Sequence, residues 1–198
     1  DLPTFVVLNA EKSHPRSNVQ AISAKLWSAG FLSPEYSGVM LNNGADPVHY
    51  LSDPDGVSRE VRRAMLDGLG DLNRIQHDEL GSPETLARIQ QYEMAYRMQM
   101  SVPEMADLSS EPESTFERWG DEARQPGKFQ NAALMARRLV ERGVRFVQIY
   151  HRGWDVHQFA PEVLPAQALD VDRAAWALIQ DLKERGLFDE TLVIWGGE

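Results

Sequence analysis

The stretch that decides the fold is Val144-Arg-Phe-Val-Gln-Ile-Tyr150, which runs directly into His151-Arg-Gly-Trp-Asp-Val-His157. A second stretch repeats this change from apolar to polar residues, because Thr191-Leu-Val-Ile-Trp195 is followed by Gly196-Gly-Glu198. Between the two, apolar residues recur at spacings of three and four from Leu164 to Leu182, which is typical of one face of a helix. The order strand, helix, strand predicts a βαβ core over about residues 144–198.

The two predicted strands of this core should be parallel, because the helix between them crosses over one face of the sheet. Their carboxyl ends then share the edge at which open α/β sheets bind ligands. Asp155 and His157 project to the same side if their segment is extended. A carboxylate and an imidazole suit zinc or manganese, with calcium or magnesium as alternatives, and Glu198 completes the predicted metal site.

These residues also have structural interpretations that do not involve a metal. A single histidine near a strand end, such as His157, is more often a structural hydrogen-bonding group than a metal ligand. Asp155 follows Gly153 and Trp154, a sequence that also suits a turn. In that alternative the segment swings into solvent, and the two side chains point away from each other and from Glu198.

The first part of the chain predicts short strands and then helices. Phe5-Val-Val-Leu8 and Val39-Met-Leu41 are typical of strands, and residues 9–18 predict a loop. From about residue 58 to residue 118 the apolar spacing predicts a helical excursion from the sheet. Its helices are expected at 61–75, from Ser82 to Met100, and from Ser114, where a glutamate three residues later suits a capping box.

A further helix is predicted from Phe129 to Val140, and Arg137-Arg138 is interpreted as part of its outer face. It should end at Glu141-Arg-Gly143, because glycine is the commonest helix stop. The same three residue types recur at 184–186, before the second strand of the core. The sequence therefore predicts one α/β domain over residues 1–198, with a mostly parallel sheet flanked by helices.

Composition excludes several classes of function. With 198 residues, of which 42% are apolar, the chain can bury one sizeable core. A net charge of -10 without a basic run argues against nucleic acid as a partner. No apolar run reaches the ~20 residues of a membrane-spanning helix, and the first residues do not form a signal peptide. The absence of cysteine excludes disulfides and thiolate chemistry.

No motif identifies a catalytic nucleophile. The formylglycine motif of sulfatases has a proline two residues after its serine or cysteine and an arginine two residues further on. Ser13-His-Pro-Arg16 has its arginine one place early. A nucleophile elbow, a phosphate loop and a dinucleotide glycine pattern are also missing. The sequence predicts a metal-binding edge and leaves the catalytic residue unknown.

Several motifs together resemble one bacterial family. They are Tyr92-Glu-Met-Ala-Tyr-Arg-Met98, Ser101-Val-Pro-Glu-Met105, Arg142-Gly-Val-Arg-Phe-Val147, the 151–157 stretch, and Asp181-Leu-Lys-Glu-Arg-Gly186 with the 191–198 stretch. They resemble family 1501 of the domains of unknown function, which is sulfatase-like and belongs to the alkaline phosphatase superfamily. Members are usually longer and often exported, either periplasmic or secreted, so the resemblance implies that this chain is an internal part of a longer protein.

The resemblance also implies roles for individual residues. Asp155 and His157 match a family motif that is similar to the superfamily's metal ligands, and Glu198 matches the acidic residue after the next strand. His151 and Arg152 are expected to contact the substrate. The family's nucleophile and its remaining ligands are expected outside these residues, so the metal site should be incomplete here.

Two functions follow from the resemblance. The first is the middle part of a metal-dependent hydrolase of sulfate or phosphate esters, acting on a small molecule or a glycan. We expect these 198 residues alone to be inactive, because nucleophilic catalysis needs an activated hydroxyl. The second is a non-catalytic, sulfatase-like domain with an export-associated binding or structural role, because a shared fold does not guarantee a shared function.

Overall fold

The computed structural model describes residues 2–18, 21–33, 36–42, 56–81, 96 and 102–197. In these ranges the sheet consists of three parallel strands in the order β2-β1-β3. The strands are β1 (Phe5–Ala10), β2 (Val39–Met40) and β3 (Phe146–His151). The predicted α/β class with a parallel sheet and flanking helices is confirmed. The strands predicted near residues 5, 39 and 144 are all present, with bounds shifted by one to two residues at most ends.

Strand β1 is the central strand, and its sequence explains why. Val6, Val7 and Leu8 are almost fully buried, which is typical of a parallel strand covered on both faces. Its register with β3 pairs Val6 with Val147 and Ala10 with His151, so the two strands end together. The predicted core paired the strand before His151 with residues 191–195 instead. Among the described residues, the partner of β3 is β1.

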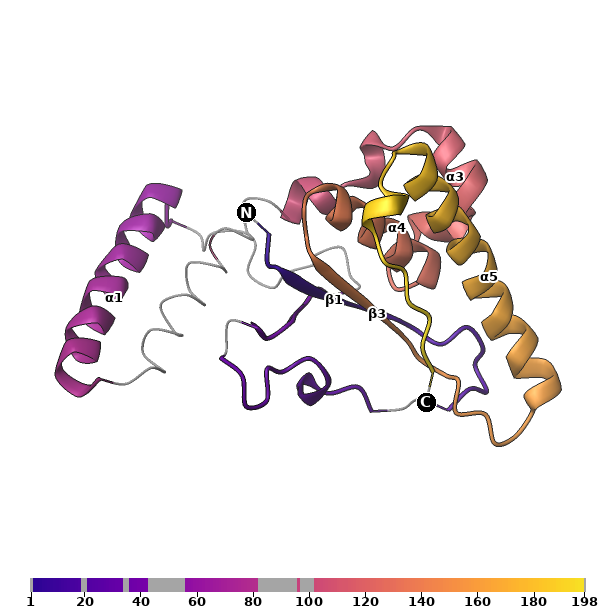
Figure 1. Cartoon of the computed structure of the whole chain (residues 1–198), viewed down its shortest axis with the longest axis horizontal. Coiled ribbons are helices and arrows are strands. Elements are labelled where there is room, and N and C mark those ends of the chain that lie inside the picture. The colour runs from indigo at the N-terminus through magenta and orange to yellow at the C-terminus, as the bar shows by residue number, and fades with distance from the viewer. Residues whose placement is uncertain are drawn as a thin grey trace.

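Two long helices cover the sheet in the arrangement that Figure 1 shows on its right side. Helix α4 (Phe129–Glu141) packs against β1 and β3, and α5 (Ala160–Glu184) packs against α4. The core between α4 and the sheet is made of small and medium apolar side chains, among them Val6, Leu8, Ala10, Ala132, Ala136 and Leu139. The stops predicted at Gly143 and Gly186 are confirmed, because both glycines have positive φ.

The prediction of a strand at residues 191–195, the second strand of the predicted core, is wrong. After α5 the chain forms the short 3-10 helix η5 (Phe188–Glu190), and residues 191–197 then carry no strand. In Figure 1 this yellow segment runs toward the edge where β1 and β3 end. Leu192, Ile194 and Trp195 are mostly exposed. Their residue types favour extended backbone, but a strand also needs a hydrogen-bonded partner about 4.8 Å away.

Helix α1 (Arg59–Leu80) is longer than the predicted helix at 61–75 and continues through two internal glycines. Ser58 caps it by accepting a hydrogen bond from the backbone N–H of Val61, and Gly81 ends it in the left-handed conformation. Its apolar stripe, which includes Met65 and Leu72, is exposed. The helix predicted from Ser82 to Met100 lies almost entirely outside the described residues.

Short helical elements connect α1 and α4. They include η3 (Leu108–Ser110), α3 (Glu113–Trp119) and η4 (Asp121–Arg124), while η1 (Ala24–Leu26) lies between β1 and β2. The capping box predicted at Ser114 is wrong, because α3 begins one residue earlier and its cap position is Pro112. Pro112 makes no side-chain cap, and its carbonyl accepts from the backbone N–H of Thr115 at 2.9 Å.

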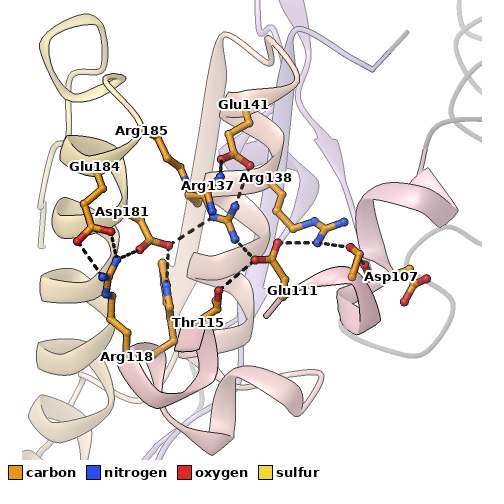
Figure 2. A network of polar contacts seen from close by, with 12 residues as sticks. Asp107, Glu111, Thr115, Arg118, Arg137, Arg138, Glu141, Asp181, Glu184 and Arg185 are labelled. Carbon is orange, nitrogen blue, oxygen red and sulfur yellow. Dashed lines mark hydrogen bonds and ion pairs between the residues drawn. The ribbon is translucent and has the colours of Figure 1, made fainter. Parts of the chain in front are cut away.

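Charged side chains connect α3, α4 and α5 in the interior, as Figure 2 shows. Arg137 lies 2.8 Å from Glu111 and 2.9 Å from Glu141, while Arg138 lies 2.7 Å from Glu111. The interpretation of Arg137-Arg138 as an outer helix face is wrong, because both side chains are nearly fully buried. Buried arginines need carboxylate partners, and the partner that both share, Glu111, is distant in the sequence. Glu111 ionises readily despite its burial, because Arg137 and Arg138 outweigh the desolvation and hold its pKa below the ordinary range.

Candidate functional site

Two polar segments meet at the carboxyl edge of the sheet because β1 and β3 are neighbours that end together. The segment after β1 comprises residues 11–18, and the segment after β3 comprises residues 152–157. The backbone N–H of Arg152 donates to the carbonyl of Ala10 at 3.3 Å, and Asn18 Nδ2 donates to the carbonyl of Asp155 at 3.2 Å. The edge on which the predicted site residues lie therefore also carries the loop after the first strand.

Gln167 of α5 fixes these two segments to each other. The side chain is fully buried, and its Oε1 accepts from the Ser13 backbone N–H at 2.7 Å. Its Nε2 donates to the Arg152 carbonyl at 2.9 Å. A buried amide that uses both its acceptor and its donor cannot move without leaving polar groups unsatisfied. Ser13 and Arg152 are consequently held by the body of the domain.

Gly153 allows the segments to approach so closely. Its φ of 98° favours glycine, and a Cβ there would lie 2.9 Å from the Cβ of Lys12 and 3.0 Å from the Cβ of Ser17. Lys12 in turn donates to the carbonyls of Pro15 and Ser17 at 2.7 and 2.9 Å, which closes the loop on itself. The glycine of the Gly-Trp-Asp-Val-His sequence is therefore required by packing against residues 12–17.

His151 connects the two segments through its ring. Its Nε2 lies 3.2 Å from Ser13 Oγ, and its Nδ1 accepts from the indole N–H of Trp154 at 3.1 Å. The ring of Phe129 lies 5.0 Å away, centroid to centroid. Burial lowers the pKa of His151, and this effect outweighs the charge of Asp170 and a backbone hydrogen bond with Glu11, which both raise it. The ring is therefore neutral at pH 7.

The predicted metal ligands Asp155 and His157 come together. Asp155 Oδ1 lies 2.6 Å from His157 Nε2, so the two side chains form a direct ion pair. The segment is not extended here, because the backbone N–H of Val156 donates to the carbonyl of Trp154 at 2.8 Å and closes a tight turn at Asp155. Both are accessible, with 41% and 73% of the side chain exposed, which leaves room for a ligand. The third predicted ligand, Glu198, lies outside the described residues, and within those residues no group of three or more metal-binding side chains occurs.

Arg152 directly follows His151 and lies three residues before Asp155 in the sequence. Its Nε is buried and has no hydrogen-bond partner in the part of the chain that the structure describes. Its backbone is fixed from both sides, by Ala10 and by Gln167. The predicted contact of Arg152 with a substrate stays a prediction.

The sequence interpretation missed three residues of this site, namely Ser13, Trp154 as a partner of His151, and Gln167. The sulfatase motif does not identify Ser13, because the arginine that follows it stands one place early. The signal that could have found it is positional, because Ser13 follows the first strand and parallel strands end at the same edge. Gln167 lies on the buried side of a helix, where its sequence neighbours give no indication of a role.

One comparison with known proteins gave a result. The family described as "Protein of unknown function (DUF1501)" matches residues 1–198. The chain belongs to this family. No curated protein and no solved structure gives a significant match to it. Membership of DUF1501 agrees with the family that the sequence motifs resemble, and it assigns no activity. In the described part of this DUF1501 chain, no helix is long and apolar enough to cross a membrane.

Proposed function

We propose that this chain supplies the cation- and ester-binding edge of a metal-dependent hydrolase of sulfate or phosphate esters. The edge is the one at which β1 and β3 end, with Asp155 and His157 as two of the cation ligands. Arg152 contacts the negatively charged ester. The proposal extends the family resemblance to residues whose arrangement supports it.

The observation that carries the proposal is the approach of Asp155 Oδ1 to His157 Nε2, which form a direct ion pair at 2.6 Å. A carboxylate oxygen and an imidazole nitrogen form a donor set that suits zinc or manganese. A shared zinc ion, with bonds of about 2.0–2.2 Å, would replace this direct contact and move the two atoms to about 3 Å apart. When bound, such an ion polarises an ester oxygen as a Lewis acid.

The protein's own residues supply the other requirements of ester binding. Arg152 is a guanidinium, which matches the oxygens of a sulfate or phosphate group and remains charged at any working pH. The Gln167 bridge and the tight packing at Gly153 hold the backbone of this edge in place. Preorganised donors of this kind lose little conformational entropy when a ligand binds.

The non-catalytic alternative makes a different prediction. In a domain that has kept the fold and lost the chemistry, a cation and an anion have no reason to bind next to each other. Sulfate affinity that rises when zinc is added supports the hydrolase edge. Sulfate affinity that is independent of zinc supports the alternative.

The direct test is calorimetric titration of the chain with Zn²⁺ at pH 7.5. We expect weak binding at one site, because zinc sites in proteins use at least three protein ligands and the described residues supply two. Asp155→Ala and His157→Ala should each abolish it. Binding should also weaken at lower pH, because the imidazole must lose its proton to bind a metal.

A matched control is available on α1, where His77 Nδ1 lies 3.6 Å from Asp78 Oδ1. His77→Ala also removes an imidazole beside a carboxylate, but far from the sheet edge, and it should leave the titration unchanged. Zinc binding that survives Asp155→Ala, or that is lost in His77→Ala, would show that the ligand set is wrong.

A further inference from the structure

We infer that Ser13 is an oxyanion-binding hydroxyl, because a hydrogen-bond chain from Trp154 through His151 directs its proton away from the imidazole and toward a ligand oxygen. The inference rests on the proposed function for the identity of the ligand, which is the non-bridging oxygen of a sulfate or phosphate group. It assigns Ser13 to binding and not to nucleophilic attack.

Trp154 sets the direction of the hydrogen bonds that run from it through His151 to Ser13. The indole nitrogen of Trp154 can only donate, and it lies 3.1 Å from His151 Nδ1. Nδ1 must therefore present its lone pair. In a neutral imidazole one nitrogen carries the proton when the other accepts. The proton of His151 is consequently on Nε2.

The second step passes this direction on to Ser13. Nε2 lies 3.2 Å from Ser13 Oγ, so the protonated Nε2 can only donate toward this hydroxyl oxygen, and it shares its proton with the backbone of Glu11. The hydroxyl's own proton cannot point back at His151, because Nε2 has no free lone pair. The half-buried Ser13 therefore offers its O–H to a group outside this chain of hydrogen bonds.

The same tautomer argues against a catalytic serine and histidine pair. A general base must accept the hydroxyl proton, and in serine hydrolases the imidazole nitrogen that faces the serine has a free lone pair. Here Nε2 is already protonated by the requirement at Nδ1. Burial lowers the pKa of His151 and keeps the neutral tautomer in place at pH 7. His151 thus acts on the ligand through Ser13 as a positioning residue.

The surroundings of Ser13 favour an anionic acceptor. Its backbone N–H is fixed by Gln167 at 2.7 Å. The two segments carry the cations Lys12, Arg16 and Arg152 and the acidic residues Glu11 and Asp155, and Lys12 already donates to two carbonyls of its own loop. Hydrogen bonds to ionised acceptors are stronger than those to neutral ones. The oxygens of a fully ionised sulfate or phosphate group carry no proton and can only accept hydrogen bonds. They therefore suit a hydroxyl whose proton is free to be donated.

The first experiment reads the tautomer directly. Long-range ¹H–¹⁵N correlation spectra of metal-free protein at pH 7.5 should show His151 as a neutral ring with its proton on Nε2. Trp154→Phe removes the indole donor, keeps the ring, and should give a mixture of the two tautomers. A wild-type ring protonated on Nδ1, or a doubly protonated ring, would overturn the inference.

The second experiment measures binding, with inorganic sulfate and inorganic phosphate as separate probes and with chelator present. Ser13→Ala should weaken the binding of at least one of the two about tenfold or more, since a hydrogen bond to a charged group is lost. Ser13→Thr keeps the hydroxyl and should retain most of the affinity. Ser28→Ala is the matched control, because that hydroxyl donates to the carbonyl of Lys25 in its own turn.

The outcomes separate this inference from the proposed function. Equal affinity of Ser13→Ala and wild type for both anions would contradict the role of Ser13, whatever the zinc titration gives. Loss of anion binding in Ser13→Ala would support it, even if zinc does not bind. In that second case the hydrolase proposal fails, while the oxyanion site remains.

Discussion

His151 Nε2 lies 3.2 Å from Ser13 Oγ, although 138 residues separate the two side chains in the sequence. The contact exists because β1 and β3 are neighbouring parallel strands that end in register at Ala10 and His151. Any polar residue placed just after either strand must therefore lie at a common edge. This relationship makes the loop after β1 part of the candidate site, and it leads to the predictions below.

Gly153→Ala should destabilise the fold by about 2–4 kcal/mol, because the backbone has positive φ and the added Cβ would collide with Lys12 and Ser17. Urea unfolding measures the change. Gly186→Ala is the control, since Gly186 also has positive φ but nothing lies within 4 Å of its added Cβ. That control should cost only about 1 kcal/mol. Equal effects of the two substitutions would show that the close approach at Gly153 is not tight.

Stability should depend on pH through His151. Burial lowers the folded pKa of this residue below its unfolded value of about 6.5. In the window between the two values the unfolded chain binds the proton and the folded chain does not. The stabilisation is therefore complete above about pH 6.5 and decreases as pH falls toward the folded pKa.

The pH dependence can be assigned by comparing urea unfolding of the wild type and His151→Gln between pH 7.5 and 5. The variant keeps a polar side chain that does not titrate, so its stability should fall less over this range. An identical slope for both proteins would mean that His151 does not carry the effect.

Arg137→Met should destabilise the fold by about 2–4 kcal/mol, because it removes the guanidinium that joins Glu111 to Glu141 and leaves Arg138 as the buried partner of Glu111. Arg74→Ala is the control. Its ion pair with Asp71 lies on the exposed surface of α1, and such pairs contribute at most about 1 kcal/mol. A loss no larger for Arg137→Met than for Arg74→Ala would show that the network in Figure 2 adds little to stability.

The 198-residue chain alone should not hydrolyse an aryl sulfate or an aryl phosphate. The hydroxyl of Ser13 has no general base, because the nitrogen of His151 that faces it carries a proton. Rates should equal those of a blank that contains only the metal. Turnover above that blank that disappears in Asp155→Ala would contradict both the role of Ser13 and the expectation of inactivity.

Local patterns predicted most elements of this fold, and pairing between distant segments explains the rest. Helix α4 and its stop at Gly143 follow from apolar spacing and from the conformational freedom of glycine. The predicted strand at 191–195 is wrong, because its residue types favour extended backbone but cannot specify a hydrogen-bonded partner. The burial of Arg137 was missed for the same reason, since Glu111 is far away in the sequence.

The same limit applies to the candidate site, where the sequence predicted only what depends on neighbouring residues. Asp155 and His157 lie two residues apart, so their approach depends on local backbone, but it comes from the tight turn between Trp154 and Val156 and not from the extended segment that the sequence predicted. The roles of Ser13 and Gln167 depend on which strand lies beside β3, and no single stretch of sequence contains that fact. Glu198, the third predicted ligand, stays a prediction.

The central claim is that a divalent cation binds between Asp155 and His157, and paramagnetic broadening by Mn²⁺ tests it most directly. Substoichiometric Mn²⁺ is added to ¹⁵N-labelled protein, and the loss of amide signals is followed residue by residue. The account predicts that signals of residues 154–157 broaden first, followed by the adjoining Asn18, while His77 and Asp78 on α1 remain sharp. Broadening of residues 77–78 to the same degree as 154–157, or no selective broadening at the sheet edge, would contradict it.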